Sequence, residues 1–121
     1  MSNSVVVDPD GTQRWYADDQ LHRIDGPAVV WTNGTQAWYE NGQLHRLDGP
    51  AFIWADGRQV WVVNDQHHRT DGPALDYANG TQEWYVDDQH ITVQVEIWMW
   101  QQKITWPWNE EIQTQFVLTF L

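Results

Sequence analysis

Short runs in which apolar and polar residues alternate cover most of this chain, and this pattern predicts β-strands. The runs 28–32 and 35–39, which read Ala-Val-Val-Trp-Thr and Thr-Gln-Ala-Trp-Tyr, flank Asn33-Gly34. Asn-Gly is a strong hairpin signal, because a type I′ turn needs positive φ at both central residues. A second turn signal follows at Asn41-Gly42. We therefore expect a hairpin, a second tight turn and a short extended piece in this segment.

The pattern returns every 23 residues without insertions, with boundaries near 5–27, 28–50, 51–73 and 74–96. The recurring residues are Trp15, Trp38, Trp61 and Trp84, then His22, His45 and His68, then Asp25, Asp48 and Asp71. A period of roughly 20–50 residues is typical of arrays whose units stack on their neighbours. We predict one mainly β domain, 1–121, of four tandem 23-residue β-hairpin repeats. They would form a rolled antiparallel sheet with a C-terminal helix-plus-strand cap.

The position of the first turn predicts which face of the hairpins is buried. A two-residue turn would pair Val29 with Trp38, so both side chains would lie on one face. The opposite face would then set Asp76 against Glu83, a like-charge pair that is tolerated only in water. We therefore expect the tryptophan column to be buried and structural. Because one sheet cannot bury a face alone, the array is expected to roll up or to be covered.

The period fails from Thr92 onward, and we interpret residues 97–121 as a capping segment. Residues 92–102 fit either a helix with Thr92 as its N-cap or a strand, because both apolar spacings are present. Residues 113–121 alternate as an amphipathic last strand does. Trp106 and Trp108 flank a proline turn. These two tryptophans either anchor the cap or form an exposed tip that binds a partner.

Charge narrows the choice of partner. The 17 acidic and 6 basic residues give a net charge of −11, which repels phosphate backbones and anionic membranes. We expect no direct nucleic-acid or membrane binding and, if charge guides a partner, a basic protein. The chain has no cysteine, no apolar run long enough to span a bilayer and no secretory leader pattern at its start. These features predict a soluble, cytoplasmic protein.

The recurring His-Arg-x-Asp pattern invites a catalytic or metal-binding interpretation. Equivalent atoms in stacked repeats lie about 9–10 Å apart, whereas Zn–N bonds are about 2 Å long, so the histidine column cannot share one ion. Arg23 and Asp25 lie two residues apart and can pair locally. We expect the histidine and aspartate columns to be structural. No P-loop, nucleophile elbow or paired-histidine zinc motif occurs, so we expect no enzyme activity, cofactor or metal.

Acidic residues also gather at the second turn of the repeats. They are Asp18, Asp19, Asp65, Asp87 and Asp88. Negative charge at turns and edges keeps β-sheets soluble and prevents their aggregation. The alternative is an acidic surface that docks on a basic, nucleic-acid-handling protein by charge complementarity.

The segment 38–51 reads Trp-Tyr-x-x-x-x-Leu-His-Arg-x-Asp-Gly-Pro-Ala. This form resembles the MORN repeat, in a MORN-like variety common in large bacteriophages. The resemblance implies an array without enzyme activity that serves as a scaffold, a lipid contact or a protein-binding surface. Low glycine content and acidity disfavour lipid contact. We expect a monomeric or homodimeric phage inhibitor, anti-CRISPR-like, that binds a host factor such as a defence nuclease in the host cytoplasm. The alternatives are a self-assembling scaffold and a glycan or small-ligand module with exposed tryptophans.

Overall fold

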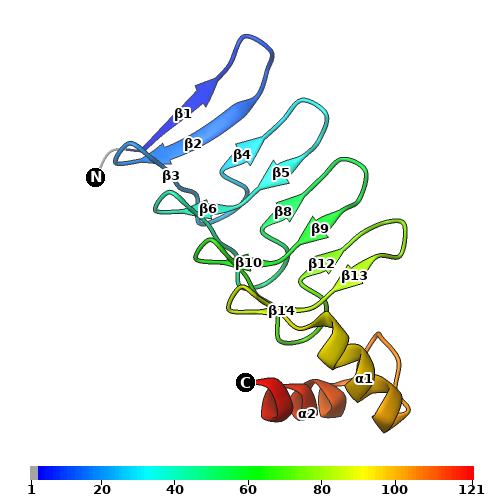
Figure 1. Cartoon of the computed structure of the whole chain (residues 1–121). Coiled ribbons are helices and arrows are strands. Elements are labelled where there is room, and N and C mark those ends of the chain that lie inside the picture. Colours follow the sequence, from blue (N-terminus) through cyan, green and yellow to red (C-terminus); the bar gives the residue numbers. More distant parts are fainter. Residues whose placement is uncertain (1–2) are drawn as a thin grey trace.

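The computed structural model describes residues 3–121 as a series of antiparallel hairpins followed by two helices (Figure 1). Residues 1 and 2 lie outside this range. The main sheet has the order β1 (Asn3–Val7), β2 (Gln13–Ala17), β4 (Val29–Val30), β5 (Gln36–Ala37), β8 (Phe52–Ile53), β9 (Gln59–Val60), β12 (Leu75–Asp76) and β13 (Gln82–Glu83), with β3 (Gln20–Leu21) paired to β2.

A second row of small hairpins lies beside this sheet (Figure 1). It contains β6 (Tyr39–Glu40) with β7 (Gln43–Leu44), β10 (Val62–Val63) with β11 (Gln66–His67), and β14 (Tyr85–Val86) with β15 (Gln89–His90). Trp38 separates β5 from β6, and later tryptophans do the same in the next two hairpins. Within residues 3–121 the two rows form an open array and do not close into a barrel, so any rolling of the sheet stops short of a closed structure.

The first turn of each unit differs from the prediction. Val29 pairs with Ala37 and Val30 with Gln36, whereas a two-residue turn would pair Val29 with Trp38. The Trp31 amide donates to the Thr35 carbonyl at 2.9 Å, which leaves the three residues 32–34 in the loop. Gly34 has a φ of 91°, so it supplies the left-handed residue of a three-residue loop. The expected type I′ turn at Asn33-Gly34 is therefore wrong.

This shift of one residue moves the second strand's side chains to opposite faces. Ala37, and not Trp38, lies opposite the buried Val29. The expected like-charge pair is also absent, because Asp76 lies opposite Gln82. The core of the central hairpins contains Ala51, Val60 and Val62, with partly buried Leu44, Phe52, Trp54, Leu75 and Tyr77 packed against it. The prediction of a uniformly buried tryptophan column is wrong, since Trp15, Trp38 and Trp61 are only half-buried.

Helix α1 (Thr92–Gln102) confirms the helical alternative for this segment. Thr92 is not its N-cap, because Ile91 occupies that position without a side-chain capping bond. The Thr92 hydroxyl instead accepts a hydrogen bond from the Trp84 amide at 2.9 Å. At the equivalent place the Trp38 amide donates to the Ala51 carbonyl at 2.7 Å. In the last hairpin the side-chain oxygen of Thr92 thus accepts the hydrogen bond that a backbone carbonyl oxygen accepts in the earlier hairpins.

Helix α2 (Glu110–Phe120) replaces the strand that we predicted over residues 113–121. Asn109 caps this helix by accepting from the Ile112 amide at 2.9 Å. Glu110 and Glu111 lie in its first turn, where negative charge is favourable. Phe116 is buried whereas Leu118 is exposed, although a strand would put both on one face. A helical stripe of Ile112, Phe116 and Phe120 faces the core and decides the conformation.

The helices cover the last hairpin with an aromatic core. Trp84, Val86, Val95, Trp98, Trp108 and Phe116 form its buried part. The Trp84 ring stacks on Trp108 at 6.0 Å, and Trp98 meets Trp108 edge-on at 5.6 Å. Neither described helix is long and apolar enough to cross a membrane.

The unequal burial of the tryptophans predicts unequal stability effects. Trp84 is 2% exposed, so Trp84→Ala is expected to lower the free energy of unfolding by roughly 3–5 kcal/mol. The half-buried Trp38 is expected to cost about half as much, because less apolar surface leaves water there. Urea unfolding followed by far-UV circular dichroism measures both. A larger loss for Trp38→Ala would contradict the observed strand register.

Candidate functional site

A tryptophan, an arginine and an Asp-Gly-Pro loop form a unit that recurs along one side of the array. The Arg46 guanidinium lies 4.0 Å from the Trp38 ring centroid, a cation–π distance. Its Nε donates to Asp48 at 2.9 Å, and its Nη1 donates to the Pro50 carbonyl at 3.1 Å. The same contacts link Arg23 with Trp15, Asp25 and Pro27, and Arg69 with Trp61, Asp71 and Pro73. The expected local pairing of Arg23 with Asp25 is thus present.

These contacts also cancel the positive charge of the protein locally. Hydrogen bonding to Arg23 and the charge of its guanidinium lower the pKa of Asp25. Each of the five arginines contacts one aspartate. The pairs are Arg14–Asp8, Arg23–Asp25, Arg46–Asp48, Arg58–Asp56 and Arg69–Asp71. The other 12 of the 17 acidic groups lie outside these five pairs. Together with the single positive charge of Lys103, they account for the whole net charge of −11.

The histidine column connects successive hairpins. The Nδ1 atom of His22 accepts from the Asn41 amide at 3.0 Å, and that of His45 accepts from the Asn64 amide at 3.1 Å. His68 accepts from the Asp87 amide at 3.0 Å in the same way. The Asp87 carboxylate lies 3.2 Å from the same nitrogen, but an accepting nitrogen carries no proton to share with it. Within residues 3–121, three or more potential metal-ligating side chains do not come together.

The second turns have the two-residue geometry that was expected of the first. Asp18 and Asp19 have φ angles of 50° and 66°, and Asp87 and Asp88 have 48° and 68°. Positive φ at both central residues is the mark of a type I′ turn, and aspartate, asparagine and glycine tolerate it. Successive turns are joined by backbone hydrogen bonds from Gly42 to Leu21, from Asp65 to Leu44 and from Asp88 to His67. The four turns therefore form one continuous row.

Within this turn row, the acidic residues have different surroundings. Asp65 accepts from the Leu44 amide at 2.7 Å, and Asp88 accepts from the His67 amide at 3.1 Å. The hydrogen bond from the His67 amide lowers the pKa of Asp88. Asp18 and Asp19 belong to the first hairpin and are exposed. The row thus combines carboxylates that hold neighbouring turns together with carboxylates that face solvent.

Trp106 and Trp108 belong to the cap. Trp108 is 7% exposed and lies in the aromatic core, so of the two alternatives it anchors the cap and does not belong to an exposed tip. Trp106 is half-buried and lies 5.2 Å from the Arg69 guanidinium. Its ring packs so tightly on Gly72 that a Cβ there would overlap it. Trp106 thus covers the last Asp-Gly-Pro loop.

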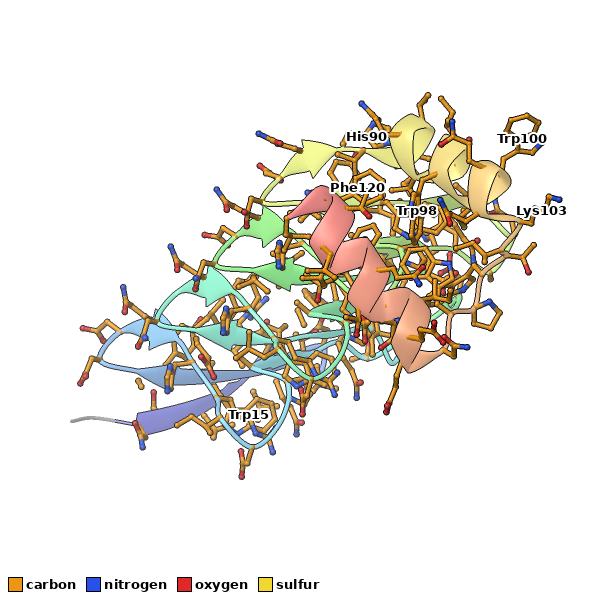
Figure 2. All side chains as sticks on the ribbon, turned by 90° about the horizontal axis from the view of Figure 1, so that it is seen from below. Trp15, His90, Trp98, Trp100, Lys103 and Phe120 are labelled. Carbon is orange, nitrogen blue, oxygen red and sulfur yellow. The ribbon has the colours of Figure 1, made fainter. Side chains whose placement is uncertain are left out.

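Sequence reasoning missed the exposed apolar face of α1. Val93, Ile97 and Trp100 are exposed, with Trp100 at 80%, and Figure 2 shows the Trp100 ring projecting from the helix. Their i, i+4, i+7 spacing places them on one side, whereas the buried Val95 and Trp98 face the aromatic core. The spacing is visible in the sequence, but it indicates an apolar face only once residues 92–102 are known to form a helix and not a strand.

Concavities lie between successive Asp-Gly-Pro loops. The one between the first two loops has a volume of about 650 Å³ and is lined by charged side chains from both loops together with Ile24, Leu47 and Trp38. The arginine over each tryptophan covers one face of its ring, so that face is closed to a stacking sugar. These contacts favour a structural role for the loops.

The chain matches no protein-family model, no curated protein and no solved structure.

Replacing Asp48 with asparagine tests the charge in the loop. The Arg46 hydrogen bond and charge hold the pKa of Asp48 below its ordinary value of 3.8. A lowered folded-state pKa means that the carboxylate stabilises the fold above the unfolded pKa, and that this contribution is lost as pH falls through the folded pKa. Asp48→Asn should therefore reduce urea resistance at pH 7, and the difference from the wild type should shrink as pH falls below the ordinary pKa of 3.8. An undiminished difference in acid would contradict this role.

Replacing Gly72 with alanine tests the docking of Trp106. The new methyl would overlap the Trp106 ring, which is held against Trp108 at 5.4 Å, so overpacking should cost about 1–3 kcal/mol. Gly49→Ala is the matched control, because its Cβ would meet the Arg46 guanidinium at 2.8 Å, as that of Gly72 would meet Arg69 at 2.7 Å, but its nearest neighbours include no tryptophan ring. The control should therefore cost less than Gly72→Ala. Equal losses in urea unfolding would show that Trp106 does not pack on this loop.

Proposed function

We propose that this protein is a non-enzymatic interaction module that docks on a basic protein through the turn row. The observation that carries the proposal is the continuity of the row, in which backbone hydrogen bonds join successive turns. Five of its residues are acidic, namely Asp18, Asp19, Asp65, Asp87 and Asp88. A continuous row of one charge sign steers and orients a partner of the opposite sign.

The distribution of the arginines supports this choice of surface. Each arginine contacts an aspartate close to it in sequence, so none of these cations is left to neutralise the turn row. Three of them are also stacked on tryptophan rings in the Asp-Gly-Pro loops. The turn row therefore keeps its negative potential.

The resemblance to MORN-like phage proteins suggests which kind of protein the partner is. We propose four stacked 23-residue repeats as a frame, with the acidic row as the contact surface. The partner is then a basic, nucleic-acid-handling host protein such as a defence nuclease, which the chain inhibits in an anti-CRISPR-like manner in the host cytoplasm. Binding a nuclease's basic surface blocks the electrostatic contacts that nucleic acid requires.

A self-assembling scaffold is the second candidate, and the exposed apolar face of α1 favours it. Val93, Ile97 and Trp100 give α1 an apolar side beyond the one that faces its own core, and exposed apolar patches mark interaction surfaces. A scaffold would form large assemblies at micromolar concentration. A docking module would stay small, and its binding would weaken with salt.

The test begins with capture of binding proteins from a bacterial lysate and identification of a basic candidate. Binding is then measured with purified components for the wild type and for a triple variant, Asp18→Asn, Asp19→Asn and Asp87→Asn. Asparagine tolerates the positive φ of these positions. Asn41 and Asn64 already occupy the first of the two central positions in the other two turns of the row. Charge therefore changes while the turn geometry is kept.

The control variant removes the same charge elsewhere, by Glu96→Gln, Glu110→Gln and Glu111→Gln on the helices. We expect the turn-row variant to weaken binding at least about tenfold, mainly through slower association, and the helix variant to weaken it less than about twofold. The wild-type affinity should fall as salt rises from about 0.05 to 0.3 M. Equal losses in both variants, or an affinity that is independent of salt, would remove the docking proposal.

A further inference from the structure

The first strand of the main sheet has a free edge. Among the described residues, β1 pairs only with β2 and stands at one end of the strand order. All five of its residues, Asn3 to Val7, are exposed. In Figure 1 this hairpin lies at the end of the array opposite the helices. The array thus ends in helices α1 and α2 at one end and in this uncovered strand at the other.

The hydrogen-bond pattern shows which backbone groups of β1 face outward. Val5 lies opposite Trp15. The Trp15 amide and carbonyl bond to Ala28 and His22, on the side away from β1. Val5 and Trp15 therefore form a non-hydrogen-bonded antiparallel pair, in which the amide and carbonyl of Val5 also point away. The alternation of a strand extends this outward orientation to Asn3 and Val7.

The composition of this edge lacks the usual protection against pairing. Exposed edge strands are normally blocked by charged residues, proline or a bulge. The strand reads Asn-Ser-Val-Val-Val and carries no charge. Its nearest carboxylate, Asp8, is paired with Arg14. In a protein with a net charge of −11, this uncharged edge is a place where two copies can approach with little repulsion.

We infer that two copies of this chain associate through antiparallel pairing of β1 with β1 about a two-fold axis at Val5. Such an isologous contact is self-complementary, because the same strand supplies both sides. Asn3 of one copy would lie opposite Val7 of the other, and about six backbone hydrogen bonds would form. Antiparallel pairing puts the two Asp8 carboxylates at opposite ends of the contact, whereas parallel pairing would place them together.

The asymmetry of the ends favours a second copy over another strand donor. Stacked arrays need both ends covered, and the chain covers one end with α1 and α2. Pairing at β1 would join the two uncovered ends and leave α1 and α2 at each end of one continuous array. This inference is independent of the turn row, whose acidic residues lie outside β1.

Two pairs of variants of the full chain test the inference. The chain has no cysteine, so Val5→Cys places a single thiol beside the two-fold axis. Directly opposed residues have Cα atoms about 5.5 Å apart in this kind of pair, within disulfide range. Val6→Cys is the matched control, because the two Val6 positions are offset along the strands by more than about 7 Å. Oxidation should cross-link the first variant at least about fivefold more than the second.

The second pair addresses association itself by sedimentation at about 1–100 μM, where the wild type is expected to be a dimer. Val5→Lys should make the protein monomeric, since the two ammonium groups would meet at the axis. Leu118→Lys adds the same charge on the exposed side of α2 and should leave the dimer intact. Circular dichroism should show both variants folded. A wild type that stays monomeric throughout, a dimer that Leu118→Lys dissociates, or equal cross-linking of Val5→Cys and Val6→Cys would each overturn the inference.

Discussion

The stacking of an arginine on a tryptophan is the interaction around which three successive loops of the array are organised, at Arg23, Arg46 and Arg69. The Arg46 guanidinium covers Trp38, binds Asp48 and reaches the Pro50 carbonyl, so one side chain closes the whole loop. Its backbone amide meanwhile donates to Val62 of the next hairpin at 3.1 Å. The same residue therefore fixes the loop within one unit and the position of the following unit. A lysine would keep the charge but could not make the two directed contacts of the planar guanidinium.

This use of arginine explains how an acidic protein separates its charges. The cations are held where they stabilise loops, and nearby aspartates cancel them. The carboxylates at the second turns have a different task, since Asp65 and Asp88 bind the amides of the preceding turn. Acidic side chains at this position therefore hold neighbouring hairpins together and also give the surface a negative electrostatic potential. The same residues serve both the architecture and the surface charge.

Much of the hairpin arrangement could be predicted from the sequence, because turn residues report local backbone geometry. The exact pairing could not. Asn33-Gly34 fits both a two-residue loop and the three-residue loop that forms, and only the buried contact of Ala37 opposite Val29 distinguishes them. The choice reversed the expected face of Trp38. A turn motif thus indicates that a hairpin exists more reliably than it indicates which residues face the core.

The C-terminal segment was harder to predict for a related reason. Residues 113–121 satisfy both strand and helix periodicities, and the capping of α2 by Asn109 together with the packing of Phe116 on Trp108 decides between them. The arginine–aspartate pairs could be predicted because they are local in sequence. The burial of Trp108 and the contact of Trp106 with Gly72 could not, because they join residues that are distant along the chain.

The hydroxyl of Thr92 has a consequence for how such a chain can change in length. It occupies the place that a backbone carbonyl takes in the preceding hairpins, so the cap presents to the last hairpin the same acceptor that another hairpin would present. A duplicated or deleted 23-residue segment would then meet compatible neighbours on both sides. Adding or removing one whole hairpin would therefore leave the contact between the last hairpin and the helical cap unchanged.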